Sequence, residues 1–281
     1  MAEFRAMAEG DLALFLRLTG LVGWGMTEQD FDRLIKFSPE GNFIASMDGS
    51  DVGMVASTMY GDVAWIGNLI VDTQLRGRGI GAALMVHAMN RLTARGVKSI
   101  RLDGVPLAIP LYRRLGFRDE YWSMRYMGEA APGPVTGVEQ MRPRDLDEVA
   151  ALDLRYFNAP RREHLEYIHG LTPELCFTHR AGGRLVGYIM GGDGLDRVKV
   201  GPWICEPGHE KGAEALLNAV MNRRPGHRVW VGFPEGNRSS RSILERNGFR
   251  EIPSSLRMCH GECRSAERVE AVYGLGGPDK G

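Results

Sequence analysis

The sequence predicts an α+β protein made of two tandem copies of one domain, each a mixed, mostly antiparallel sheet flanked by helices. Three observations support this prediction. Short apolar runs separated by turns over residues 42–71 indicate an antiparallel meander. A glycine-rich turn then separates the last of these runs from a helical pattern at residues 82–95. Finally, two strings from the first half of the chain recur in the same order in the second half.

The composition limits the classes of protein to consider. The chain has 281 residues, which is long for one ordinary domain and sufficient for two. Its 35 basic residues balance its 35 acidic residues, and this argues against nucleic-acid and membrane-surface partners, which favour a basic excess. No apolar run approaches the roughly 18 residues of a membrane-spanning helix. The first residues lack the apolar segment of a secretory signal, and four scattered cysteines fit a reducing compartment, so we expect a cytoplasmic protein.

The elements of the first half follow from apolar spacing and from turn residues. Residues 4–7 indicate a short strand, and Asp11 is placed to cap a helix. Thr27 and Asp30 form a weak capping box at the start of a second helix. Gly96 ends the long helix of this half. Further strands are predicted at residues 42–47, 52–60, 63–71, 97–103 and 121–127, and a short helix at residues 107–115.

The second half repeats the first. Residues 141–146 match residues 5–12, and residues 244–250 match residues 112–118. The order of strand-like and helical runs between the two strings also matches, which favours tandem duplication over a chance resemblance. In the second copy, strands are predicted at residues 174–178, 184–190, 197–204 and 228–233, and helices at residues 210–223 and 237–246. The predicted domains are residues 1–130 and 138–281, joined by a proline- and glycine-rich linker at residues 131–137.

Residues 76–82, called the glycine turn below, link an apolar strand to the long helix of the first half. Three alternate positions are glycine: Gly77, Gly79 and Gly81. The backbone N–H groups are therefore little shielded, and the helix that follows adds its own unpaired N–H groups and the positive end of its dipole. Arg76 and Arg78 add positive charge. This pattern predicts a binding site for a phosphate or pyrophosphate group.

Two common nucleotide motifs fit this turn poorly. A Walker loop is excluded because no Gly-Lys-Ser/Thr follows the glycines. The spacing Gly77-x-Gly79-x-x-Ala82 satisfies a loose dinucleotide fingerprint. However, polar residues separate the strand from the first glycine, and an antiparallel meander precedes it, whereas a dinucleotide fold places the glycines directly after the first strand of a parallel unit. The sequence therefore disfavours a dinucleotide site.

The strand and the glycine turn resemble the acyl-CoA-binding motif of the GNAT superfamily of N-acetyltransferases. The string Val71-Asp72-Thr73-Gln74-Leu75-Arg76-Gly77-Arg78-Gly79-Ile80-Gly81-Ala82 is similar to the family's Val-x-x-x-x-Arg/Gln-Gly-x-Gly-Ile/Leu-Gly/Ala. A second string, Pro110-Leu111-Tyr112-Arg113-Arg114-Leu115-Gly116-Phe117, is similar to the family's helix that ends in x-Leu-Tyr-x-x-x-Gly-Phe. The resemblance covers residues 4–127 well and the second half as a degraded copy. It implies a GNAT-like fold for each copy.

The resemblance implies acetyl-CoA as co-substrate and no metal. In this family, backbone N–H groups of the glycine turn bind the CoA pyrophosphate, and the edge of the preceding strand faces the pantetheine amides, which can add to it like an extra strand. The residues that the resemblance places at the donor site are Leu69, Ile70, Val71, Arg76, Gly77, Arg78, Gly79, Ile80, Gly81 and Ala82.

The resemblance also implies one catalytic residue and leaves the general base open. Tyr112 matches the tyrosine that gives a proton to the departing CoA thiolate. The strand before the glycine turn presents no group that can take a proton from the acceptor amine. The alternatives are a base that acts through water, or one of Asp103, Tyr60, Glu28 and Asp30, each of which is also explained as a cap, turn or surface residue. Trp24, between two glycines, lies in the segment that borders the acceptor in this family, and the candidate acceptor-site residues are Trp24, Tyr60 and Asp103.

The second copy departs from the phosphate-binding pattern. Residues 206–213 match the glycine turn, but Pro207 removes an N–H group, and Glu206 and Glu210 bring negative charge. Leu244 stands at the position of the tyrosine. We expect this copy to lack CoA binding and catalysis, and to serve structure or the acceptor site. Cys259, His260 and Cys263 lack a fourth ligand, so we predict core or surface residues there rather than a metal site.

These observations predict an enzyme that moves an acetyl group from acetyl-CoA to a primary amine of a small molecule by direct attack. Two alternatives stay open: an acetyltransferase for protein lysines or N-termini, and a non-catalytic acyl-CoA-binding sensor. The balanced charge and the second copy, which can enclose an acceptor, favour the small molecule. We expect a monomer or a homodimer.

Overall fold

The structure is a computed structural model that describes residues 2–263 and 268–281. It divides into two compact units. Among the described residues, the N-terminal unit comprises residues 2–120, 257–263 and 278–281, and the C-terminal unit comprises residues 121–256 and 268–277. No helix of the described residues is long and apolar enough to cross a membrane.

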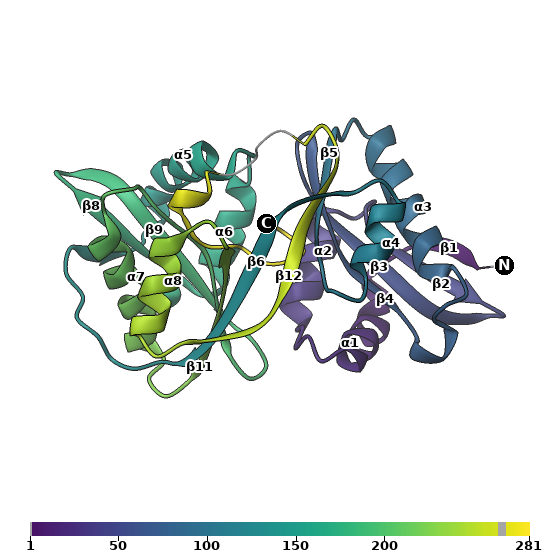
Figure 1. Ribbon diagram of the computed structural model, residues 1–281, viewed down its shortest axis with the longest axis horizontal. Helices are drawn as coiled ribbons and strands as arrows, with labels where there is room; N and C mark the ends of the chain where they lie inside the picture. Colours follow the sequence, from purple (N-terminus) through teal and green to yellow (C-terminus); the bar gives the residue numbers. More distant parts are fainter. Residues whose placement is uncertain (1, 264–267) are drawn as a thin grey trace. The chain divides into compact units, whose positions relative to one another are not determined.

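The N-terminal unit contains the predicted antiparallel meander followed by a parallel crossover (Figure 1). Its sheet runs in the order β1, β2, β3, β4, β5 and then the part of β12 that belongs to this unit; β1 to β4 pair antiparallel, and β4 pairs parallel with β5. The strands are β1 (Glu3–Ala6), β2 (Phe43–Met47), β3 (Ser50–Tyr60), β4 (Val63–Val71) and β5 (Ser99–Gly104). The helices are α1 (Leu12–Leu21), α2 (Glu28–Phe37), α3 (Ile80–Ala94) and α4 (Ile109–Arg114), with short 3₁₀ turns η1 (Glu9–Asp11) and η2 (Thr73–Leu75).

Helices cover both faces of this sheet. Ile44 packs in a core cluster with residues of α1 and α2, whereas its neighbour Phe43 meets the ring of His87 on α3. Because successive side chains in a strand point to opposite faces, α3 lies on the face opposite α1 and α2. The predicted capping box is confirmed, since Thr27 and Asp30 exchange backbone-to-side-chain hydrogen bonds at the start of α2.

Asp11 does not cap α1 as predicted. The chain makes the 3₁₀ turn η1 before the helix, and the Asp11 carboxylate accepts a hydrogen bond from the Ala8 N–H at 2.8 Å. Its oxygens also pair with Arg5, and this hydrogen bond lowers the pKa of Asp11. The carboxylate therefore fixes the turn that precedes α1.

The C-terminal unit repeats the same plan. Its strands run in the order β7, β8, β9, β10, β11, β6 and then the remainder of β12, with β13 antiparallel to β10. The strands are β7 (Val138–Gln140), β8 (Phe177–Ala181), β9 (Arg184–Asp193), β10 (Val198–Cys205), β11 (Arg228–Pro234), β6 (Arg118–Glu129), β12 (Arg250–Gly261) and β13 (Val272–Gly274). The helices are α5 (Leu146–Phe157), α6 (Arg162–Leu171), α7 (Glu210–Arg223) and α8 (Arg238–Arg246), with 3₁₀ turns η3 (Pro143–Asp145), η4 (Pro173–Leu175) and η5 (Val269–Ala271).

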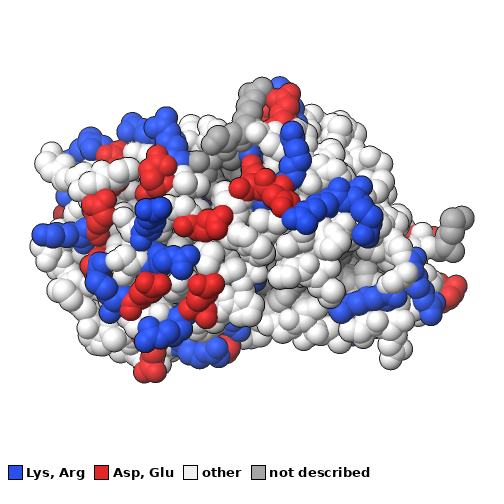
Figure 2. Space-filling view, viewed as in Figure 1, with Lys and Arg blue, Asp and Glu red and all other residues white. Residues whose placement is uncertain are grey.

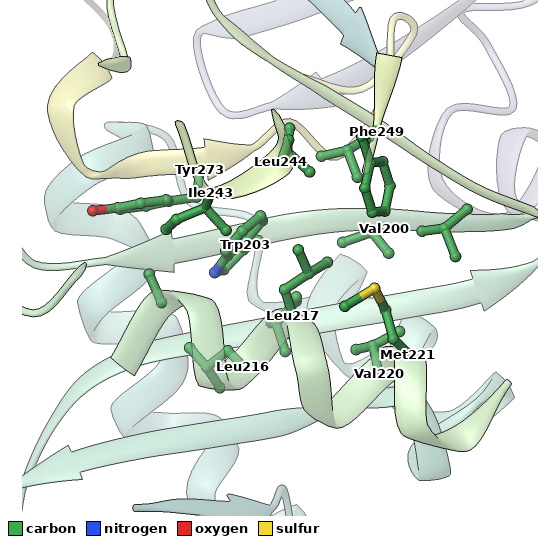
Figure 3. Packing of buried hydrophobic residues seen from close by; sticks show 14 of the residues in the cluster. Val200, Trp203, Leu216, Leu217, Val220, Met221, Ile243, Leu244, Phe249 and Tyr273 are labelled. Carbon is green, nitrogen blue, oxygen red and sulfur yellow. The ribbon is translucent and has the colours of Figure 1, made fainter. Parts of the chain in front are cut away.

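The core of this unit lies between α7, α8 and the sheet (Figure 3). Trp203 on β10 packs with Tyr273 on β13, their ring centroids 5.2 Å apart. Leu216, Leu217 and Val220 of α7 are fully buried in the same cluster. Tyr273 thus places part of the C-terminal stretch in this core.

The compact units do not follow the two sequence copies at every point. β6 comes from the first copy, yet from Tyr121 onward it belongs to the C-terminal unit and pairs antiparallel with β11. β12 comes from the second copy, yet Arg257–Cys263 belong to the N-terminal unit. The predicted domains, residues 1–130 and 138–281, describe the repeat in sequence, whereas the units describe packing.

The cysteines and the charged residues add two observations. Cys259 and Cys263 form a disulfide, which the sequence analysis did not foresee, while Cys176 and Cys205 are free and buried. Among the described residues, no group of three or more acidic, histidine or cysteine side chains could hold a metal ion. Basic and acidic side chains lie side by side over much of the face drawn in Figure 2.

Asn237, at the start of α8, has a structural role that can be tested. Its side chain accepts the Ser240 N–H at 2.8 Å to cap α8, and donates to the Val272 carbonyl at 2.9 Å to hold β13. Asn237→Ala should lower the free energy of unfolding by about 2 kcal/mol, because it removes a cap and leaves buried backbone groups unpaired. Denaturant titration measures this loss, and an unchanged midpoint would contradict the assignment.

Candidate functional site

In the N-terminal unit, β4 leaves β5 after the first third of its length. The parallel ladder joins Val63 to Ser99, Ala64 to Ile100 and Trp65 to Arg101, and among the described residues it goes no further. On its other edge, β4 stays paired with β3 as far as Val71. The last six residues of β4 therefore have an open edge on the β5 side, where backbone groups can pair with an extended ligand.

A bulge accompanies this separation. The register between β3 and β4 shifts between the Met54–Ile70 and Ala56–Gly67 pairs. Asn68 lies in the shifted part with a φ of 52°, a left-handed conformation that asparagine tolerates better than most residues. A bulge bends a strand and increases its twist, so it turns the end of β4 away from β5.

The glycine turn follows β4 and exposes its backbone donors. Gly77 and Gly79 have φ values of 79° and 82°, which only glycine adopts without strain. Across residues 76–82, no backbone N–H donates to another described residue, and Ile80 begins α3. Arg76 Nε donates to the Val71 carbonyl at 3.1 Å, so this side chain ties the turn to the end of β4. The turn thus has the exposed donors and the helix dipole of an anion site.

Tyr112 lies on α4, packed against the end of β5. A Cβ on Gly104, the last residue of β5, would lie 3.1 Å from the Tyr112 ring, so glycine there leaves room for the ring. The side chain of Phe117 meets the same ring, with centroids 6.0 Å apart. Burial raises the pKa of the Tyr112 phenol to about 12, because a charged phenolate would lose hydration there. The phenol is therefore protonated at neutral pH.

Comparison with known proteins agrees with this geometry. The model of the acetyltransferase (GNAT) family matches residues 15–117, and that of an acetyltransferase (GNAT) domain matches residues 149–274. The chain belongs to the GNAT family, as a tandem protein with two GNAT domains.

Relatives and solved structures match this chain over most of their own length. A holothin acyltransferase from Pseudoalteromonas is 24% identical over 90% of this chain and 86% of that protein, and an uncharacterized N-acetyltransferase, YitH, from Bacillus subtilis is 24% identical over 88% and 87%. A putative acetyltransferase structure from Pyrococcus horikoshii superposes with a TM-score of 0.84 at 23% identity, covering 100% of this chain and 96% of that one. A tandem GNAT protein from the clavulanic acid pathway gives a TM-score of 0.68 at 16% identity, covering 93% and 98%. The predicted fold is therefore confirmed, and the family supports an acyl-CoA-dependent acyltransferase.

The GNAT donor residues named from sequence lie along one continuous path. Leu69, Ile70 and Val71 form the end of β4, and residues 76–82 follow after one 3₁₀ turn. The Ile70 side chain is buried in the core between the sheet and α1–α2, so only its backbone can face a ligand. Arg78 is exposed. Their individual roles at the donor site stay predictions.

The candidate Asp103 is held in a buried ion pair. Arg257 donates to both of its oxygens, at 3.1 and 2.9 Å, and both side chains are almost completely buried. Trp65 lies beside this pair, with the guanidinium groups of Arg257 and Arg101 each 5.8 Å from its ring. Arg101 in turn pairs with Glu120. This geometry gives the Asp103 carboxylate a structural role at the end of β5.

The other candidates for the acceptor site and the general base lie on different elements from Asp103. Trp24 is 37% exposed in the loop between α1 and α2, between Gly23 and Gly25, which both have left-handed φ values. Tyr60, at the end of β3, donates its hydroxyl to the Lys280 carbonyl at 3.1 Å. Asp30 caps α2 and lies 3.8 Å from Lys280 Nζ, while Glu28 begins that helix.

Sequence reasoning missed several residues at this site. Asn68 is a polar residue inside an otherwise apolar strand, and this irregularity was a usable signal. Gly104 precedes the helix of Tyr112 without any local pattern that sets it apart. Arg33, Arg257 and Asp279 gain their roles from residues far away in sequence, and no local pattern indicates such partners.

The second GNAT copy fills its own glycine-turn position with side chains. Glu206 pairs with Arg184 at 2.7 Å, a hydrogen bond that lowers the pKa of Glu206. Glu210 accepts the Gly208 N–H at 3.0 Å. A Cβ on Gly212 would come within 3.0 Å of the His179 ring. Carboxylates and an imidazole thus lie where a phosphate would bind.

Replacing Asp103 distinguishes a structural carboxylate from a catalytic base. Asp103→Asn leaves the Arg257 guanidinium buried without its counter-charge, and this should lower the free energy of unfolding by about 3–5 kcal/mol. The double variant Asp103→Leu/Arg257→Met removes both charges and should recover much of that stability. Denaturant titration measures both variants. A stable Asp103→Asn protein whose pH–rate profile loses one ionisation would instead identify a base.

Proposed function

We propose that the N-terminal GNAT unit transfers an acetyl group from acetyl-CoA to a primary amine of a small molecule. The observation that carries this proposal is the open edge of β4, which leads after one 3₁₀ turn to the exposed donors of the glycine turn. Few ligands need both features at once. CoA does, because its amide-bearing arm is joined to a pyrophosphate.

The residues of this unit fit the donor from end to end. The N–H groups of residues 76–82 and the α3 dipole would hold the pyrophosphate, with Arg78 free to add charge at the surface. Backbone groups of Leu69, Ile70 and Val71 would pair with the pantetheine amides. The thioester of acetyl-CoA supplies an activated acyl group. Side chains of this protein would have to protonate the leaving thiolate and position the acceptor amine.

Tyr112 is suited to protonate the sulfur that leaves. Its phenol keeps the proton at neutral pH because burial raises its pKa to about 12. A thiolate that leaves into apolar surroundings has a raised pKa, since burial disfavours the anion, and this reduces the difference in pKa between the phenol and the thiol. The reaction then needs an acceptor amine in its neutral form, which attacks the carbonyl carbon.

Replacing Tyr112 tests the catalytic assignment. Tyr112→Phe keeps the ring against Gly104 but removes the proton, so kcat should fall by about 100-fold while the Kd for CoA stays unchanged. Thiol release from acetyl-CoA with a panel of amines, amino acids, aminoglycosides and peptides measures the first quantity, and calorimetry the second. Unchanged thiol release with every acceptor would remove Tyr112 from the mechanism. A wild-type protein that binds CoA and releases no thiol with any acceptor would favour a sensor.

A matched pair of glycines tests the donor site. Gly79 and Gly208 have φ values of 82° and 88°, and each lies just before a long helix, α3 or α7. A valine at either position is strained by about 1–2 kcal/mol, so both variants should lose similar stability. Only Gly79→Val should weaken CoA binding, by at least about tenfold, because the strained turn no longer presents its N–H groups together.

Calorimetry of the wild type and both variants gives the affinity and the number of sites. One CoA per chain, with binding lost only in Gly79→Val, is the expected result. Two sites per chain, or equal weakening by Gly208→Val, would show that the second copy also binds the donor.

A further inference from the structure

The segment Pro278–Gly281, called the 278–281 segment below, belongs to the N-terminal unit and lies against β4. A Cβ on Gly67 would lie 2.9 Å from the Asp279 Cα, closer than such atoms approach in proteins. Glycine at position 67 therefore makes room for the backbone of Asp279. This contact is one residue before Asn68 and two before Leu69, where the proposed donor edge begins.

Charged groups of the N-terminal unit hold the segment by its side chains. Arg33 on α2 donates to the Asp279 carboxylate and, at 2.9 Å, to Thr58 Oγ1. Arg33 is only 3% exposed. Asp30, one turn earlier on α2, lies 3.8 Å from Lys280 Nζ. The unit thus offers a cation to a carboxylate and an anion to an ammonium group.

A polar side chain also binds the backbone of the 278–281 segment. The Tyr60 hydroxyl donates to the Lys280 carbonyl at 3.1 Å. The four charges of Arg33, Asp30, Asp279 and Lys280 sum to zero. Without the segment, one positive and one negative charge would face the same space, and this arrangement is complementary to a ligand that carries both an amine and a carboxylate.

The 278–281 segment does not provide acceptors for all the buried donors around it. Arg33 Nε and Asn68 Nδ2 have no hydrogen-bond partner among the described residues. An unpaired buried donor costs about 1–3 kcal/mol, so such groups normally mark a missing acceptor. A guanidinium binds a free carboxylate through two parallel N–H groups, and the unused Nε can serve as one of them. Asn68, next to Gly67, offers a further donor on β4.

We propose that Arg33 and Asp30 form the acceptor site, that the acceptor is a small amine which also carries a carboxylate, and that Asp279 and Lys280 occupy this site until the acceptor displaces them. This inference rests on the proposed function for the role of the amine as acceptor. The binding site itself does not depend on acetyl transfer. Arg33 selects the carboxylate, and Asp30 supplies the negative charge that attracts the ammonium form.

The first experiment measures competition within the full chain. Asp279→Asn keeps the shape of the segment and removes the charge that competes for Arg33. The KM for glycine, β-alanine and 4-aminobutyrate should fall by about tenfold for those among them that are acetylated, with kcat unchanged, and the KM for their amides should not move. Asp196→Asn, which removes an exposed carboxylate paired with Arg197 and Arg228, is the matched control and should leave KM unaltered. A lower melting temperature with unchanged KM values would show that Asp279 is purely structural, and would overturn the inference.

The second experiment needs no turnover. A chain that ends at Gly277, with folding verified by its melting curve, is titrated with a labelled peptide of residues 276–281. The peptide should bind, and its Asp279→Asn form should bind at least tenfold more weakly. The three amino acids should displace it better than their amides. Absence of peptide binding, or equal displacement by amides, would overturn the inference.

The two experiments together separate failure of the inference from failure of the proposed function. If amino acids displace the peptide but the wild-type chain releases no thiol with any amine, the site assignment holds and acetyl transfer fails. If thiol is released with simple amines while no carboxylate-bearing amine displaces the peptide, acetyl transfer holds and the acceptor site lies elsewhere.

Discussion

The N-terminal unit depends on the separation of β4 from β5. The ladder between them ends at Trp65 and Arg101, and the bulge at Asn68 bends the rest of β4. The open edge of β4 leads into the glycine turn, while the end of β5 supports the ring of Tyr112 through Gly104. Each part of the proposed donor site is therefore positioned by one of the two strands that border the opening, and a fully paired β4 would leave no edge for a ligand.

The charged layer beneath this opening explains why the two copies depend on each other. Asp103 is almost completely buried, and a buried carboxylate is tolerable only with a partner that satisfies its oxygens. That partner, Arg257, comes from the second copy, as does His260, whose ring lies 5.5 Å from Phe117 behind Tyr112. The first copy alone would lack this partner of Asp103. The second copy thus contributes to the first unit whether or not it binds CoA itself.

The sequence predicted what local patterns determine. Apolar periodicity placed most helices and strands within a few residues, and the glycine turn was evident because its function resides in consecutive residues. It could not predict Arg33 with Asp279 or Asp103 with Arg257, which are 246 and 154 residues apart. Arg33 stands in the charged string Gln29-Asp30-Phe31-Asp32-Arg33, which is typical of a solvent-facing helix surface, and only the fold shows that the side chain is buried.

The carboxylates of Glu210 and Asp279 are attached to their units in different ways. In the C-terminal unit, Glu210 accepts the Gly208 N–H from within the first turn of α7, so its carboxylate stays beside the turn even when this hydrogen bond opens. In the N-terminal unit, Asp279 approaches Arg33 from a segment that follows Gly276 and Gly277, and such a pair of glycines lets a chain change direction at little steric cost. A carboxylate on such a segment can leave while α2 and β4 keep their structure. Arg33 can therefore exchange the Asp279 carboxylate for the carboxylate of an acceptor, which an arginine with a permanent partner cannot do.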